Sequence, residues 1–293
     1  MKVIEDQMVK KIVIVGSGAL ATLYAIRFSD YFNVTRLGSW LEGISALNMK
    51  AILVESDSEV IAENIFATTN WLDSEKPDLV VWLTKGYKNS NALKEYLKLN
   101  WQIPILILQN GSGQKELFKS VLNADQNIYL GTTTQGAKLK GPGKVENTGN
   151  GNLILESNQF LKSFFQNTLP TIQFEEKIEK SILKKLAINA AINPTAAIFK
   201  VKNGEVVNGE AGMYLIKIAK EVFPYFLARG LFSEFSEYED LLNKIAKATS
   251  ENVNSMWADL DSGRGTEIDS ILGVINKELK SDFLSEIIKQ LTL

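Results

Sequence analysis

Residues 11–29 of the chain read KIVIVGSGALATLYAIRFS. The first five residues form an apolar, β-branched run, which is typical of a strand buried on both faces. Two glycines follow within the next three residues, and residues 19–29 predict a helix. The next segment, NVTRL at 33–37, predicts a second strand. A strand, a crossover helix and a second strand imply a parallel sheet.

The same alternation continues along the chain. Strands are predicted at 79–84, 103–108 and 128–133, and helices lie between them at 90–99 and 114–121. Strands that alternate with helices in this way favour a doubly wound α/β domain.

The α/β region ends with a different kind of sequence. Segment 136–149, GAKLKGPGKVENTG, is rich in Gly and Lys and predicts an exposed hairpin. Two more short strands are expected at 153–156 and 171–175.

From about Ile178 onward the strand signals nearly vanish, and long amphipathic helical patterns continue with breaks near 203–209 and 262–265. The fold class is therefore α/β, with an N-terminal Rossmann-like doubly wound sheet and a C-terminal all-helical domain. We expect the Rossmann-like domain to span residues 1–176 and the helical domain to span residues 177–293.

Composition excludes several classes of chemistry. The chain has 293 residues with 45% hydrophobic and 23% charged side chains, so it is long enough for two domains with separate cores. It contains neither cysteine nor histidine, which excludes disulfides, thiol catalysis, thiolate or histidine metal sites and a Ser-His-Asp triad. Proton transfer must therefore use Lys, Asp, Glu, Tyr or bound water.

Charge and hydropathy set expectations for partners and location. The net charge of −2 gives no general reason to bind nucleic acid or an anionic membrane. No apolar run reaches the roughly 20 residues that span a bilayer, and the N-terminal residues 1–11 lack a secretory apolar region. We expect a soluble cytoplasmic protein, without a metal, that acts on a small molecule as a monomer or homodimer.

The glycines after the first strand match the dinucleotide fingerprint Gly-x-Gly-x-x-Gly/Ala. Gly16 permits the tight turn, Gly18 lets the backbone approach a pyrophosphate, and Ala21 allows close packing of helix on strand. The phosphates would lie at the helix N-terminus, where N–H groups and the helix dipole favour an anion. The alternative is a purely structural glycine turn.

The end of the second strand usually distinguishes NAD from NADP, because an acidic residue there binds the ribose 2′-hydroxyl. The sequence Arg36-Leu-Gly-Ser39 has no acidic residue. Arg36 can pair with a 2′-phosphate and Ser39 can hydrogen-bond to it, which favours NADP(H). The alternative for Arg36 is a solvated surface residue.

Six segments, in order and spacing, make the sequence similar to the ketopantoate reductase (2-dehydropantoate 2-reductase) family over nearly its full length. They are GSGAL at 16–20, LTK at 83–85, QNGSG at 109–113, KKLAINAAINPTAA at 184–197, ENVNSM at 251–256 and TEID at 266–269. The fourth segment is the most specific of the six.

The resemblance implies roles for individual positions. Lys185 falls on the family's catalytic lysine, and Glu267 falls on its acidic partner. The remaining implied contacts are with substrate at Asn110, Asn189, Asn193, Asn252 and Ser255, and with the cofactor at Gly16, Ser17, Gly18, Ala19, Leu20, Lys85 and Asn110. The family usually has an arginine where this chain has Ser39, so a strict preference for NADPH over NADH stays open.

Helical spacing supports part of this assignment without the family. Lys185, Asn189 and Asn193 are four residues apart, so they share one face of a predicted helix whose intervening residues are almost all apolar. A polar stripe of this kind is costly to bury without partners, and lining a polar cleft would satisfy it. The alternative is a stripe bonded within the core or facing solvent.

A lysine is the natural acid in a chain without histidine. Partial burial would lower the Lys185 pKa toward neutrality, and its charge would stabilise a developing alkoxide. Lys184 lies about 100° around the helix and is expected to face elsewhere.

Three further sets of polar residues are predicted from local patterns. Thr266 and Asp269 resemble a capping box, which would place Glu267 in the first turn of a helix. Asn252 and Ser255 are three residues apart, so one helix face would present both. Lys85 and Asn110 follow predicted strands, where open α/β sheets bind ligands.

These residues and the resemblance lead to one expected function. We expect NADPH-dependent reduction of 2-dehydropantoate to (R)-pantoate in pantothenate and coenzyme A biosynthesis, with Lys185 as general acid and the active site in the cleft between the domains. A paralogous NAD(P)H-dependent reductase of another 2-keto acid is the nearest alternative. A non-enzymatic NADP-sensing regulator is the alternative from another class.

Overall fold

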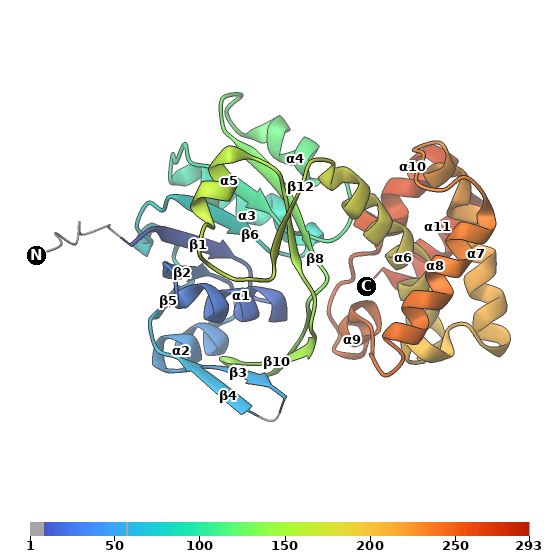
Figure 1. The fold of residues 1–293 in the computed structure, drawn as a ribbon, viewed down its shortest axis with the longest axis horizontal. Coiled ribbons are helices and arrows are strands. Elements are labelled where there is room, and N and C mark those ends of the chain that lie inside the picture. Colours follow the sequence, from blue (N-terminus) through green and yellow to red (C-terminus); the bar gives the residue numbers. More distant parts are fainter. Residues whose placement is uncertain (1–8, 57, 293) are drawn as a thin grey trace, which may run out of the picture. The chain divides into compact units, whose positions relative to one another are not determined.

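The computed structural model describes residues 9–56 and 58–292, and the expectation for the N-terminal residues 1–11 lies largely outside this range. The chain divides into two compact units (Figure 1). The first holds the described residues up to Gln109 together with Lys115–Ile178. The second holds Asn110–Gln114 and the described residues from Glu179 onward. No helix within these ranges is long and apolar enough to cross a membrane.

The first unit is built on an eight-stranded sheet in the order β12-β11-β8-β7-β6-β1-β2-β5. All neighbouring strands pair in parallel except β11, which runs antiparallel to β8. The strands are β1 (Lys11–Val15), β2 (Asn33–Leu37), β5 (Ile65–Thr68), β6 (Leu79–Trp82), β7 (Ile105–Ile107), β8 (Ile128–Thr133), β11 (Leu153–Glu156) and β12 (Ile172–Glu175). The α/β fold class is confirmed, and β6 and β7 are shorter than expected.

Helices cover both faces of this sheet. Successive side chains of β1 point to opposite faces, and those on each face pack against a different set of helices. Ile12 and Ile14 pack with α1 and α5, whereas Val13 and Val15 pack with α3 and α4. The helices of the unit are α1 (Ala19–Ser29), α2 (Leu41–Met49), α3 (Asn89–Lys98), α4 (Gln114–Val121) and α5 (Gln159–Phe164).

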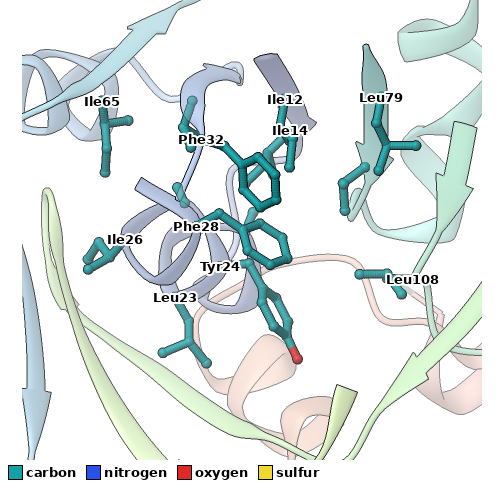
Figure 2. Packing of buried hydrophobic residues seen from close by; sticks show 14 of the residues in the cluster. Ile12, Ile14, Leu23, Tyr24, Ile26, Phe28, Phe32, Ile65, Leu79 and Leu108 are labelled. Atoms are coloured by element: carbon teal, nitrogen blue, oxygen red, sulfur yellow. The ribbon is translucent and has the colours of Figure 1, made fainter. Parts of the chain in front are cut away.

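Helix α1 is buried nearly all round, as expected of a helix that is apolar on every side. Figure 2 shows Tyr24, Phe28 and Phe32 in a column beside Ile12 and Ile14. The Tyr24 and Phe28 rings stack at 5.5 Å, and the Tyr24 hydroxyl lies 2.5 Å from the Thr133 hydroxyl. These contacts fix the helix whose N-terminus follows the glycine loop.

A second sheet lies against α1 and was not expected from the sequence. Its order is β4-β3-β10-β9, with β3 (Ala51–Glu55), β4 (Ser58–Ala62), β9 (Gly136–Gly141) and β10 (Lys144–Gly149). The predicted hairpin forms, since β9 and β10 pair antiparallel. It is not simply exposed, because β10 also pairs with β3 and Val145 is fully buried.

The second unit contains only helices and turns among its described residues (Figure 1). Tyr238 is buried in its core and donates a 2.6 Å hydrogen bond to the Ala187 carbonyl, which ties α8 to α6. The helices are α6 (Ile178–Phe199), α7 (Gly209–Leu227), α8 (Phe235–Ala248), α9 (Ser255–Asp261), a π-helix (Asp269–Gly273), α10 (Val274–Leu279) and α11 (Asp282–Leu291).

Candidate active site

The glycine loop of the first unit has room for an anion. Gly16 has φ +151°, and a Cβ there would lie 2.8 Å from the Leu83 carbonyl oxygen, so glycine is required. A Cβ on Gly18 would meet nothing within 4 Å. Gly18 is the N-cap of α1 and supplies no side-chain cap, and the first intrahelical bond is from Thr22 N to Gly18 O. The preceding N–H groups of the helix are therefore available to a phosphate.

The end of β2 lies beside this loop. Ser39 is exposed, and its backbone N–H donates to the Ser17 hydroxyl at 3.0 Å. A Cβ on Gly38 would lie 2.9 Å from that hydroxyl, so the two loops approach closely. Ser39 is thus held at the surface next to the glycine loop.

Arg36 is not a solvated surface residue, because only 2% of it is exposed. Its Nε donates to the Gly16 carbonyl at 3.0 Å, so the guanidinium lies directly under the glycine loop. Burial lowers the Arg36 pKa to about 10, which leaves the group charged at neutral pH. The alternative of a solvated surface residue is therefore wrong, and the pairing of Arg36 with a 2′-phosphate stays a prediction.

A buried polar network joins the ends of β6 and β7. Gln109 donates to the Thr84 carbonyl at 2.6 Å, and Asn89 donates to the Gln109 side chain at 3.1 Å. Trp82 donates to Thr84 Oγ1 at 2.9 Å. Lys85 follows this network directly and is partly buried. Sequence reasoning missed the network, although a polar residue after each apolar strand was a usable signal.

In the second unit, α6 carries the expected polar stripe. Lys185 and Asn189 are partly buried and Asn193 is 8% exposed, whereas Lys184 is exposed. Burial lowers the pKa of Lys185 to about 8, and the Glu267 carboxylate opposes this shift. The two adjacent lysines therefore differ in environment as helical geometry predicts.

Asn110 and Glu267 are brought together from segments far apart in sequence. Asn110 Nδ2 donates to Glu267 Oε2 at 3.0 Å, and Glu267 is 7% exposed. The Asn110 Oδ1 atom is buried with no hydrogen-bond partner among the described residues. The segment is held by a bond from Ser112 N to Ser270 O, and a Cβ on Gly111 would collide with that oxygen at 2.4 Å.

The capping box predicted around Glu267 does not form. The Ile268 N–H donates to Thr266 Oγ1, which itself donates to the Leu291 carbonyl at 2.9 Å. Glu267 therefore precedes the π-helix, and its carbonyl accepts from Ser270 N at 3.1 Å. Its carboxylate is left to face Asn110.

The prediction that Asn252 and Ser255 share a helix face is also wrong. Asn252 lies in the loop before α9, where its N–H donates to Thr249 O, while Ser255 is the exposed first residue of the helix. Asn254 stands between them as the N-cap. Its Oδ1 accepts from Trp257 N at 2.9 Å, as N-cap side chains commonly do. Its Nδ2 donates to Asn193 O at 3.4 Å and so connects α9 to the polar stripe.

Within residues 9–56 and 58–292 no three acidic, histidine or cysteine side chains gather in a way that could hold a metal ion.

An open glycine loop on a parallel sheet, with a partly buried lysine near an acidic residue on a helical unit, is typical of nucleotide-dependent oxidoreductases of two-domain architecture. Residues 12–159 match the family described as ketopantoate reductase PanE/ApbA, and residues 177–278 match its C-terminal domain. The chain belongs to the ketopantoate reductase family.

Individual relatives agree with this assignment. The chain is 33% identical to a 2-dehydropantoate 2-reductase of Pyrococcus horikoshii, over 90% of this chain and 89% of the relative. It is 30% identical to the 2-dehydropantoate 2-reductase of Bacillus subtilis, over 92% and 90%.

Solved structures show the same fold. A probable 2-dehydropantoate 2-reductase of Bacillus subtilis superimposes with a TM-score of 0.77 at 28% identity, covering 96% of this chain and 99% of that one. D-mandelate dehydrogenase bound to NADH and anilino(oxo)acetate superimposes with a TM-score of 0.83 at 23% identity, covering 96% and 98%.

Proposed function

We propose that this protein reduces 2-dehydropantoate to (R)-pantoate with NADPH, in the biosynthesis of pantothenate and coenzyme A. The observation that carries the proposal is Lys185, a partly buried lysine on α6 whose pKa is lowered to about 8. A chain without histidine has no other common side chain that titrates near neutrality. Membership of the family and its 2-dehydropantoate 2-reductase relatives support this choice of substrate.

The first unit suits the cofactor. Gly16, Ser17, Gly18, Ala19 and Leu20 would hold the pyrophosphate of the dinucleotide at the N-terminus of α1, where the Gly18 position is open. Lys85 and Asn110 would contact its nicotinamide half. The nicotinamide, when bound, supplies the hydride. The preference for NADPH over NADH is a separate part of the proposal, because Ser39 carries no charge that could pair with the 2′-phosphate of NADPH.

Lys185 would act at the carbonyl oxygen of the keto acid. As the carbonyl carbon is reduced, its oxygen gains negative charge, and the Lys185 ammonium donates a proton from Nζ to it. A pKa near 8 keeps most of the lysine protonated at neutral pH and still makes it a better acid than an exposed lysine.

The remaining polar groups would position the substrate. Asn189 and Asn193 extend the stripe on α6, and Asn252 and Ser255 flank the N-cap of α9 that is bonded to Asn193. The unused Oδ1 of Asn110 can accept a hydrogen bond from a ligand, while Glu267 fixes the other end of that amide. Glu267 also holds the Lys185 pKa higher than burial alone would set it.

The same proposal assigns a separate role to each domain. Residues 1–176 would bind the dinucleotide, and residues 177–293 would bind and protonate the keto acid. We further propose a cytoplasmic enzyme that works as a monomer or homodimer. A dimeric ketopantoate reductase of Staphylococcus aureus shares the fold with a TM-score of 0.77 at 18% identity. Light scattering of the purified protein measures the oligomeric state directly.

The deciding experiment is NADPH oxidation by the purified protein with 2-dehydropantoate, beside a panel of other 2-keto acids. We expect the highest kcat/KM with 2-dehydropantoate and a drop of about a thousandfold in Lys185→Ala, as for loss of a general acid. Lys184→Ala, its exposed neighbour, is the matched control and should keep wild-type activity. Turnover of another keto acid with none of 2-dehydropantoate would refute the substrate, and comparable kcat/KM with NADH would refute the cofactor preference.

A further inference from the structure

Arg36 is a buried cation beneath the glycine loop. Only 2% of the residue is exposed, and among the described residues it forms no ion pair with a carboxylate. Its one described polar contact is neutral, the 3.0 Å hydrogen bond from Nε to the Gly16 carbonyl. Arg27, on the neighbouring helix, shows the usual arrangement, since its guanidinium pairs with Glu55.

Such a group is expensive in a folded protein. Removing a charge from water costs several kcal/mol unless a partner of opposite sign or a full set of hydrogen bonds compensates for it. An apolar residue would suit the position, because the strand partners of Arg36 are Ile14 in β1 and Ala67 in β5. The sheet itself therefore gives no reason for an arginine.

The position of the guanidinium indicates where an anion would bind. Its hydrogen-bond acceptor is the first glycine of the loop, two residues before the open N-terminus of α1 at Gly18. The positive end of the helix dipole and the Arg36 charge lie at the same loop, and both favour an anion there.

We propose that the counter-ion of Arg36 is a phosphate group of the bound dinucleotide, so that this buried arginine, and not the residue at the Ser39 position, supplies the cationic charge of the site. This inference rests on the dinucleotide-binding part of the proposed function. The phosphate belongs either to the pyrophosphate, which NADH and NADPH share, or to the 2′-phosphate of NADPH alone.

The test separates ligand binding from folding. Arg36→Met removes the charge and keeps an unbranched apolar side chain. We expect the ligand-free variant to unfold at the same or a higher temperature than the wild type, because it loses a buried charge that has no ion-pair partner among the described residues. We expect its Kd for NADPH, measured by calorimetry without keto acid, to rise about tenfold or more. Arg36→Lys keeps the charge and should lose less affinity than Arg36→Met.

Arg27→Met is the matched control, and it should lower the unfolding temperature while leaving the Kd unchanged, because it breaks an ion pair away from the loop. An equal loss of NADH and NADPH affinity in Arg36→Met assigns the pyrophosphate, and a loss confined to NADPH assigns the 2′-phosphate. The inference is wrong if Arg36→Met fails to fold, unfolds at a lower temperature or binds NADPH as tightly as the wild type. In that case Arg36 only stabilises the glycine loop. Since no keto acid is used, failure to reduce 2-dehydropantoate would refute the proposed function and leave this result standing.

Discussion

Replacing Glu267 by Gln should change the pH dependence of the reaction as well as its rate. Lys185 must be protonated to act as an acid, so wild-type kcat/KM for keto-acid reduction should fall as pH rises through about 8. The Glu267 charge raises the Lys185 pKa against the effect of burial. Glutamine removes that charge but can still accept the hydrogen bond that Asn110 Nδ2 donates at 3.0 Å.

The size of the shift follows from ordinary electrostatics. An opposite charge close by moves a pKa by about 1 to 3 units, so a shift of about 1 unit would place the Lys185 pKa near 7 in Glu267→Gln. At pH 8 the protonated fraction of Lys185 would fall from about one half to about one tenth, a loss of about fivefold. At pH 6 the lysine is protonated in both proteins, and this part of the loss should vanish.

The measurement is kcat/KM for 2-dehydropantoate between pH 5.5 and 10 at saturating NADPH. Asp240→Asn, an exposed acidic position on α8, is the control for a general loss of negative charge and should leave the profile unchanged. A Glu267→Gln profile that breaks at the wild-type pH, or at a higher one, would show that Glu267 does not set the Lys185 pKa.

Other substitutions test the loop and the helical core. Gly16→Ala should destabilise the protein by about 2–4 kcal/mol, since a Cβ would meet a backbone oxygen at 2.8 Å with φ at +151°; urea unfolding measures this. Gly18→Ala meets open space and should keep wild-type stability while raising the Kd for dinucleotide. Tyr238→Phe should lose about 1–2 kcal/mol with the hydrogen bond to Ala187, by the same assay. Lys185→Met should raise stability at pH 7, and unchanged or lower stability would contradict its costly burial.

The local part of the fold is readable from the sequence. The bounds of β1, α1, β2, α4, β8 and β11 match the predicted ranges, because apolar periodicity and glycine signals act within a few residues. The second sheet is not readable in this way. Its central pair joins β3 with β10 across about ninety residues, and nothing in either segment identifies the other as its partner.

In the candidate site too, local features can be predicted from the sequence and contacts between distant segments cannot. Helical spacing separates Lys185 from Lys184, and this difference can be predicted. The contact of Asn110 with Glu267 spans 157 residues and depends on packing that no spacing rule describes. The burial of Arg36 was not predicted, because the residue was treated as the end of a strand, whereas a strand between two parallel neighbours is buried on both faces.

Two cations removed from solvent, the buried Arg36 and the partly buried Lys185, argue for function because both oppose stability. The folded-state pKa of Lys185, about 8, lies below its ordinary value of 10.5. Between these values the unfolded chain binds more protons than the folded one, so stability rises with pH through that window. The cost is therefore fully present below pH 8, and it amounts to about 3 kcal/mol at 1.36 kcal/mol per pKa unit. Selection for stability alone would replace such residues with apolar ones. Their retention is explained if one charge meets a phosphate and the other meets the oxygen that gains charge during reduction.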